Sequence, residues 1–102
     1  MVKKEAVALV KRYVKFLVDN NYKIKQAYLF GSYSTGKSNE DSDMDVALFI
    51  EDLKDSFSTM LQLMKCRRQF DLKIEPHVLD AKDIKDQTPF AVQILKTGIK
   101  VF

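Results

Sequence analysis

Two aspartates separated by one residue are the side chains in this sequence best suited to chemistry. Asp43 and Asp45 stand directly before an apolar run at residues 46–50, which has the composition of a buried strand. Side chains alternate between the two faces of a strand, so residues two apart point to the same side. Two carboxylates on one short segment suit Mg²⁺, which takes one or two protein carboxylates and completes its octahedron with water and substrate phosphate. We therefore expect a metal-bound nucleotide as the ligand.

A glycine-serine pair supplies the second half of such a site. Gly31 follows an aromatic and apolar run at residues 26–30, which predicts a strand that ends in a sharp turn. If residues 33–35 start a short helix, its free N–H groups and the hydroxyl of Ser32 would face an anion. Lys37 lies in the same segment and adds a positive charge. The turn is thus expected to hold a triphosphate while the aspartates hold the metal.

A third carboxylate can come from either of two residues. The sequence alternates between Asp71 and Glu75, which predicts that these two acids and Lys73 share one face of a strand. Either acid could reach the metal from that face. Two further acids, Glu40 and Asp41, precede the extended run, so we expect water around them rather than a metal.

This set of motifs resembles a known family. A Gly-Ser pair, ten intervening residues and an Asp-x-Asp pair on successive strands are similar to the minimal nucleotidyltransferases of the DNA polymerase beta superfamily, and the resemblance covers nearly the whole chain. It implies that Ser32 contacts the triphosphate, and that Asp43, Asp45 and a third acid bind two metal ions. It favours Glu75 as the third acid, because in the family that acid lies a short loop before the last helix. The family more often has Asp at that position.

The resemblance also implies a reaction and a partner. The expected activity is transfer of AMP from ATP to an acceptor hydroxyl, dependent on Mg²⁺ or Mn²⁺, with release of pyrophosphate. Larger relatives carry additional domains that bind the acceptor, whereas solitary small domains are commonly paired with a helical HEPN-type toxin. Such domains act as antitoxins that transfer AMP to a tyrosine of the toxin. Two alternatives stay open: a nucleotide-binding module that neutralises or regulates a partner without turnover, and a homodimer that modifies a small molecule.

The rest of the sequence predicts the elements that position these residues. We expect a single α/β domain over residues 1–102, with a mixed sheet of three or four strands flanked by helices. Thr88 is a good N-cap and Gly98 a natural helix stop, which predicts a helix between them. The predicted helices cover residues 3–20, 54–68 and 89–97, and the predicted strands cover residues 26–30, 46–50, 72–78 and 99–102.

Apolar spacing predicts which helix faces are buried. In the first helix, the inward stripe consists of Val7, Val10, Val14 and Leu17. A second apolar row, for which we favour core burial over a partner surface, consists of Leu9, Tyr13 and Phe16. In the second helix, the residues assigned to the core are Phe57, Met60, Leu61 and Met64.

Several residues near the expected site have ordinary structural explanations. His77, the only histidine, could approach the substrate or donate a proton, but we favour a structural or merely nearby role. Lys65, Arg67 and Arg68 cluster near the end of the second helix, where positive charge complements the helix dipole, and we favour this explanation over nucleotide contact. Pro76 cannot donate a ladder hydrogen bond, so pairing should end on one side of its strand.

Composition limits the functional classes further. The chain has 102 residues, of which 46% are apolar and 30% charged, as in ordinary globular domains. No apolar run reaches the roughly 18 residues that span a bilayer, and no signal-peptide pattern is present, so we expect a cytoplasmic location. The single Cys66 cannot form an internal disulfide and is assigned to packing. The net charge of +3 is spread without a dense basic block, so nucleic-acid binding is not expected; Lys37 and Lys73 are the lysines best placed to attract a triphosphate.

Overall fold

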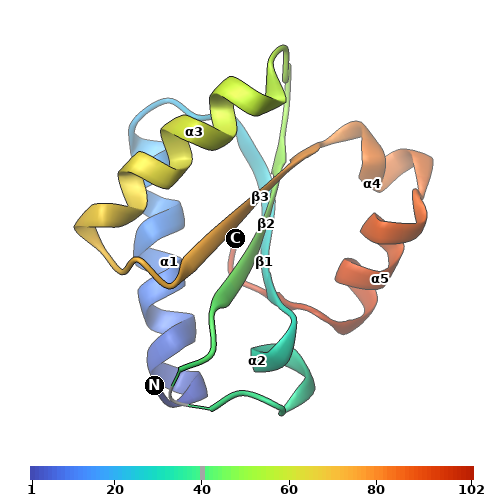
Figure 1. The fold of residues 1–102 in the computed structure, drawn as a ribbon. Coiled ribbons are helices and arrows are strands. Elements are labelled where there is room, and N and C mark those ends of the chain that lie inside the picture. The colour runs from blue at the N-terminus through green and yellow to red at the C-terminus, as the bar shows by residue number, and fades with distance from the viewer. Residues whose placement is uncertain (40) are drawn as a thin grey trace.

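The computed structural model describes residues 1–39 and 41–102, so Glu40 lies outside the described residues. Figure 1 shows a central sheet with α1 and α3 on one side and α4 and α5 on the other. The elements in chain order are α1 (Lys3–Asp19), β1 (Ile24–Phe30), α2 (Ser32–Thr35), β2 (Met44–Ile50), α3 (Ser56–Cys66), the 3-10 helix η1 (Arg67–Gln69), β3 (Ile74–Asp80), α4 (Lys82–Asp86), α5 (Pro89–Thr97) and β4 (Ile99–Lys100). This is the α/β architecture that the sequence predicts.

The sheet is mixed, with strand order β3-β2-β1-β4. β1 runs antiparallel to β2 and to β4, whereas β2 and β3 are parallel. Pro76 pairs with Val46 from the edge strand β3, whose outer side has no neighbouring strand in the sheet. Asp45 pairs with Phe30 of β1 on one side and with Glu75 of β3 on the other. The C-terminal end of β1 and the N-terminal ends of β2 and β3 therefore lie together at one end of the sheet.

Each face of the sheet carries its own apolar cluster. Alternation along β2 sends Val46 and Leu48 to the cluster that includes α1, and Ala47 and Phe49 to the cluster that includes α5. The second cluster consists of Tyr28, Ala47, Phe49, Ala81, Ala91 and Ile94. Asp45, which has the same parity as Ala47, thus belongs to the α5 face of the sheet.

Helix α1 confirms the core assignment of its two apolar rows in large part. Val10, Val14 and Leu17 are fully buried, and Val7 is partly buried. From the second row, Tyr13 is fully buried and donates a hydrogen bond from its hydroxyl to the backbone oxygen of Leu63, with 2.8 Å between the two oxygens. Burial raises the pKa of the Tyr13 phenol well above its ordinary value.

Helix α3 is shorter and rotated relative to the prediction. It begins after Asp55, whose carboxylate accepts a hydrogen bond from the backbone N–H of Ser58 at 3.0 Å. The core assignment of Phe57 and Leu61 is wrong, because Phe57 is 65% exposed to solvent and Leu61 is 44% exposed. Leu63 is instead the buried residue of this helix. Spacing alone identifies an apolar row, but the approach of the sheet selects which row is covered.

Strand β3 begins two residues later than predicted. Residues 71–73 form a turn in which the Asp71 carboxylate accepts a hydrogen bond from the backbone N–H of Lys73 at 2.8 Å. The predicted strand alternation over Asp71 and Lys73 is therefore wrong, and only Glu75 of the two candidate acids lies on the strand.

The helix α4 was not predicted, whereas α5 begins at Pro89 after Thr88 and ends before Gly98 as expected. Among the described residues, we find no helix with the length and apolar character needed to cross a membrane.

Candidate functional site

The turn after β1 lies directly against a carboxylate of β2. Gly31 has φ +76° and ψ −142°, a backbone conformation that is nearly restricted to glycine. A Cβ atom at this position would lie only 2.6 Å from Oδ2 of Asp45. Two hydroxyls hold the turn, because Ser34 and Thr35 both donate to the backbone oxygen of Gly31, at 3.0 and 3.2 Å. The glycine is therefore required both by the turn and by the carboxylate.

Asp45 is the centre of this arrangement. It pairs in register with Glu75, and paired residues on neighbouring strands project to the same face of the sheet. Its Oδ1 atom lies 3.0 Å from Nε2 of His77, two residues further along β3. The Asp45 side chain is 32% exposed, so it is held by its neighbours and still reaches solvent. His77 is thus in direct contact with a predicted metal ligand, which spacing along the chain did not indicate.

Glu75 is engaged by a basic residue from the end of α3. Nη1 of Arg67 lies 3.2 Å from Oε1 of Glu75 and donates to the backbone oxygen of Ile74 at 2.8 Å. The Arg67 side chain is only 17% exposed, whereas that of Glu75 is 42% exposed. The charge of Arg67 is therefore directed at the candidate third acid, and the assignment of this residue to the helix dipole missed its principal contact.

The other predicted site residues surround this centre. Asp43 is exposed and directly precedes β2. Ser32 is half-buried at the first position of α2, one residue after the glycine that touches Asp45. Lys37 is exposed, and its backbone N–H donates a hydrogen bond to the backbone oxygen of Ser32 at 3.0 Å.

Two acids considered from the sequence have other surroundings. Asp71 serves the turn before β3, as described above. Asp41 has a 99% exposed side chain and lies 3.7 Å from the ammonium of Lys73. The expectation that Asp41 is solvated agrees with this exposure.

The carboxylates at this site could supply some of the oxygen ligands of an Mg²⁺ ion. Among the described residues, no cluster of three or more acidic, histidine or cysteine side chains forms a complete cage for a metal. Mg²⁺ does not need such a cage, because it usually binds one or two carboxylates together with water and substrate phosphates. Asp43 and Asp45 meet that requirement, whereas Glu75 would have to share its carboxylate with Arg67.

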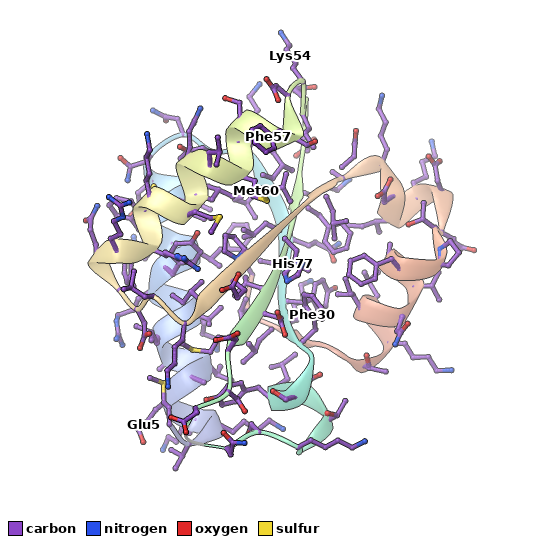
Figure 2. All side chains as sticks on the ribbon, in the orientation of Figure 1. Glu5, Phe30, Lys54, Phe57, Met60 and His77 are labelled. Atoms are coloured by element: carbon purple, nitrogen blue, oxygen red, sulfur yellow. The ribbon has the colours of Figure 1, made fainter. Side chains whose placement is uncertain are left out.

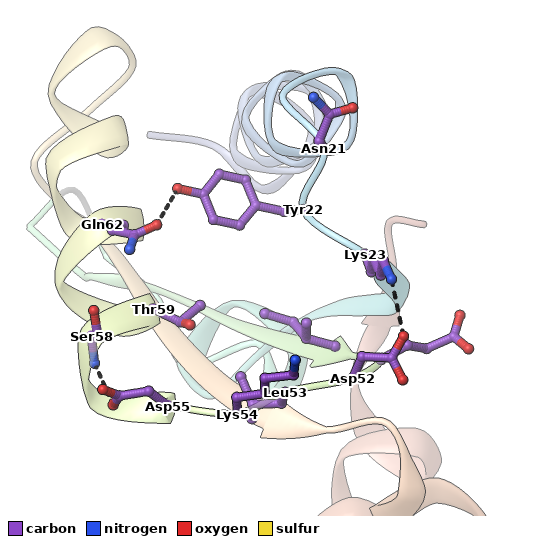
Figure 3. Close-up of a pocket in the computed structure, with 12 residues that line it drawn as sticks. Asn21, Tyr22, Lys23, Asp52, Leu53, Lys54, Asp55, Ser58, Thr59 and Gln62 are labelled. Atoms are coloured by element: carbon purple, nitrogen blue, oxygen red, sulfur yellow. Dashed lines mark hydrogen bonds and ion pairs between the residues drawn. The ribbon is translucent and has the colours of Figure 1, made fainter.

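A groove of about 740 Å³ lies at the opposite end of the β1–β2 hairpin, beside Ile50 rather than Asp45. Figure 3 shows that several of its polar side chains bind one another. The pairs drawn there are Tyr22 with Gln62, Lys23 with Asp52, and the backbone N–H of Ser58 with Asp55. The hydrogen bond from Lys23 lowers the pKa of Asp52. These polar groups hydrogen-bond to one another within the fold, so the end of the sheet around Asp45 is the stronger candidate site.

Solved structures first define the class of fold. The chain is similar to a Sulfolobus solfataricus protein assigned as a nucleotidyltransferase, with a TM-score of 0.72 and 20% identity, over 96% of this chain and 80% of the other. It is also similar to a structure of a toxin-antitoxin with AMP-PNP, with a TM-score of 0.63 and 26% identity, over 90% of this chain and 72% of the other. The four-stranded mixed sheet is thus the fold of a nucleotidyltransferase.

The family is established by sequence. Residues 13–102 match the family described as Polymerase beta, Nucleotidyltransferase, and the chain belongs to this family. A Methanocaldococcus jannaschii protein assigned by name as a protein adenylyltransferase is 39% identical over 62 residues, which cover 60% of this chain and 61% of the relative. The protein adenylyltransferase MntA of Shewanella oneidensis is 42% identical over 45 residues, which cover 44% of this chain and 32% of the relative. The matches thus span less than two thirds of either relative.

Proposed function

We propose that this protein is a metal-dependent nucleotidyltransferase that transfers AMP from ATP to a hydroxyl of a partner protein. The observation that carries the proposal is that the Asp45 carboxylate occupies the space a side chain at Gly31 would need, at the end of the sheet where Glu75 pairs with Asp45. A phosphate held at this turn would lie beside the Asp45 carboxylate, and carboxylate and phosphate oxygens are the ligands that Mg²⁺ would take here. The names of the two adenylyltransferase relatives support AMP as the transferred group.

In this proposal each residue has a separate task. The backbone of Gly31 and the hydroxyl of Ser32 hold the triphosphate, with Lys37 as a nearby positive charge. Asp43 and Asp45 hold Mg²⁺ or Mn²⁺, and Glu75 contributes to a second metal position. When bound, the metal would lower the pKa of the acceptor hydroxyl and neutralise charge on the leaving group.

The proposed reaction replaces one bond at the α-phosphorus of ATP with another. The acceptor hydroxyl releases its proton to solvent, its oxygen forms a bond to the α-phosphorus, the bond from that phosphorus to the bridging oxygen breaks, and pyrophosphate leaves. Asp45 keeps its orientation through His77, which contacts the carboxylate oxygen opposite the one beside Gly31. The acceptor would approach from the side of β3, because the β1 side is used by the triphosphate turn.

We further propose that the acceptor belongs to a HEPN-type helical toxin and that the protein acts as its antitoxin in the cytoplasm. Two similarities support this: one relative is named MntA, and one similar structure is a toxin-antitoxin with AMP-PNP. A protein acceptor also agrees with the relatives' names, which specify protein adenylyltransferases.

The test is transfer of label from α-labelled ATP, with Mg²⁺ or Mn²⁺, to the product of the neighbouring gene copurified with this protein. We expect label on the partner with the unchanged protein, and none with Asp43→Asn/Asp45→Asn. A matched control is Glu51→Gln/Asp86→Asn, which removes the same charge from two exposed acids outside the site. Equal labelling by both double variants would contradict the proposal.

A second candidate is a module that binds nucleotide and regulates its partner without turnover. The ion pair between Arg67 and Glu75 favours it, because a carboxylate engaged by an arginine is less available to a metal. Under this alternative, the complex would form and bind ATP, yet the partner would carry no label. Glu75→Ala would then leave neutralisation of the partner intact.

A further inference from the structure

Three aromatic rings contact one another in series beside the candidate site. The ring centroid of Phe30 lies 4.9 Å from that of His77 and 5.8 Å from that of Phe90, both in edge-to-face geometry. Figure 2 shows Phe30 and His77 next to each other at the centre of the molecule, toward the α5 side. We call these three residues the aromatic platform. Phe90 is 44% exposed, so the platform keeps an open apolar surface.

The platform is joined to the site at two points. Phe30 directly precedes Gly31 and pairs with Asp45 across the sheet. His77 contacts the Asp45 carboxylate at 3.0 Å. A planar group that stacks on the platform would therefore lie within one residue of the phosphate turn and beside the metal-binding acid.

We propose that the aromatic platform stacks the base of the nucleoside triphosphate and so selects purines over pyrimidines; this rests on the proposed function. The base is joined to the triphosphate through the ribose, and the platform begins at the residue before the triphosphate turn. The acceptor is proposed to approach near Glu75 at the start of β3 and Arg67 of η1, whereas Phe30 and Phe90 of the platform belong to β1 and α5. A nucleobase is thus the aromatic group that the position of the platform fits.

The chemistry of the platform determines what kind of selection it makes. The two phenylalanine rings have no hydrogen-bonding groups, and of the two ring nitrogens of His77, Nε2 is in contact with Asp45. Aromatic rings recognise bases through their π-faces, which tolerates different bases. A purine presents a larger face than a pyrimidine. ATP and GTP should therefore bind with similar affinity, and both should bind more tightly than CTP.

The experiment compares Phe90→Ala with Phe102→Ala, since Phe102 has the same side chain and is 45% exposed. Binding of ATP, GTP, CTP and inorganic tripolyphosphate would be measured by calorimetry with Mg²⁺. Phe90→Ala should weaken ATP and GTP binding about tenfold, a loss within the range measured for stacked bases. Tripolyphosphate has no base, so its affinity should not change. Phe102→Ala should match the unchanged protein with all four ligands.

Two further variants separate stacking from packing. Phe90→Leu keeps an apolar side chain against Phe30 but has no π-face, so it should lose purine affinity like the alanine variant. Phe90→Tyr keeps the ring and should retain that affinity. The platform proposal is overturned if Phe90→Ala binds ATP with normal affinity, or if its affinity for tripolyphosphate falls as much as its affinity for ATP. It is also overturned if the only effect of Phe90→Ala is a weaker complex with the partner protein.

Failure of the proposed function gives a different result. In that case the unchanged protein would bind neither ATP nor tripolyphosphate with Mg²⁺, and Asp43→Asn/Asp45→Asn would change nothing. If the unchanged protein binds both ligands through these aspartates while Phe90→Ala has no effect, the platform proposal alone is wrong.

Discussion

Replacing Gly31 with alanine tests the contact on which the proposed site depends. The φ of +76° at Gly31 is in a region that favours glycine, and a strained residue of this kind costs about 1–3 kcal/mol of unfolding free energy. The added Cβ would also lie 2.6 Å from Oδ2 of Asp45, whereas ordinary contact begins at 3.4 Å. The carboxylate oxygen must therefore move by about 0.8 Å, the difference between these two distances.

A shift of this size should affect catalysis as well as folding. A displacement of about 1 Å can lower a reaction rate about 100-fold, because the reacting groups leave their productive geometry. The hydrogen bond from His77 to the other oxygen of Asp45 opposes a simple rotation of the carboxylate. We therefore expect Gly31→Ala to transfer AMP about 100-fold more slowly yet still to fold, because the strain of about 1–3 kcal/mol is smaller than the 5–15 kcal/mol that stabilises a typical domain.

Gly36 provides the matched control. It also has a positive φ, +77°, but among the described residues, its two chain neighbours aside, no atom lies within 4 Å of the Cβ that alanine would add. Gly36→Ala should lose about 1–2 kcal/mol of stability through backbone strain alone. Urea unfolding would measure both stabilities, and label transfer to the copurified partner would measure both rates. Full activity in Gly31→Ala, or an equal loss in Gly36→Ala, would refute the argument.

The remaining predictions concern the metal, the third acid and the core. Asp45→Asn should weaken Mn²⁺ binding about tenfold or more, measured by water proton relaxation with no nucleotide present, and unchanged binding would exclude Asp45 as a ligand. Glu75→Gln should slow AMP transfer while Asp71→Asn should not, because only Glu75 lies beside Asp45 on β3; the reverse order of rates would make Asp71 the third acid. Tyr13→Phe should lower the unfolding free energy in urea by about 0.5–1.5 kcal/mol, because the Leu63 backbone oxygen loses the Tyr13 hydroxyl and keeps only the backbone N–H of Arg67 as donor. Since burial raises the pKa of Tyr13 above 10.0, the folded protein holds this proton more tightly than the unfolded chain, so stability should fall as the pH rises above that value and should fall less steeply in Tyr13→Phe.

Local patterns were sufficient for much of the fold. The end signals Thr88, Pro89 and Gly98 predicted the bounds of α5 correctly, with Pro89 at the first helical position, although the Thr88 side chain makes no capping hydrogen bond and Gly98 is extended rather than left-handed. Strand β3 was placed two residues early, because Asp71 forms a local turn that competes with strand geometry. Helix α4 has only five residues and no apolar repeat long enough to identify it.

The buried face of α3 could not be predicted for a different reason. The row that contains Phe57 and Leu61 has the same helical spacing as a core row, yet it faces solvent. Which row is buried depends on how the helix lies on α1 and the sheet, and the hydrogen bond between Tyr13 and Leu63 spans 50 residues. Spacing within eleven residues contains no information about such a contact.

The sequence by itself determined the types of chemical group and the family. Gly31, Ser32, Asp43 and Asp45 form a motif whose spacing is meaningful along the chain, since turn and strand geometry relate neighbouring residues. These residues remain the predicted centre of nucleotide transfer. The family match over residues 13–102 agrees with the resemblance that the motif carries.

Only the tertiary structure decided what surrounds that motif. Asp45 contacts His77 across 32 residues of sequence, Arg67 turns back to Glu75, and Phe90 of α5 meets Phe30 of β1. These contacts follow from the register of parallel β2 and β3 and from the packing of α5 on the sheet. A register shift of one residue would send each strand side chain to the opposite face, so these neighbours depend on the assembled sheet rather than on any local pattern.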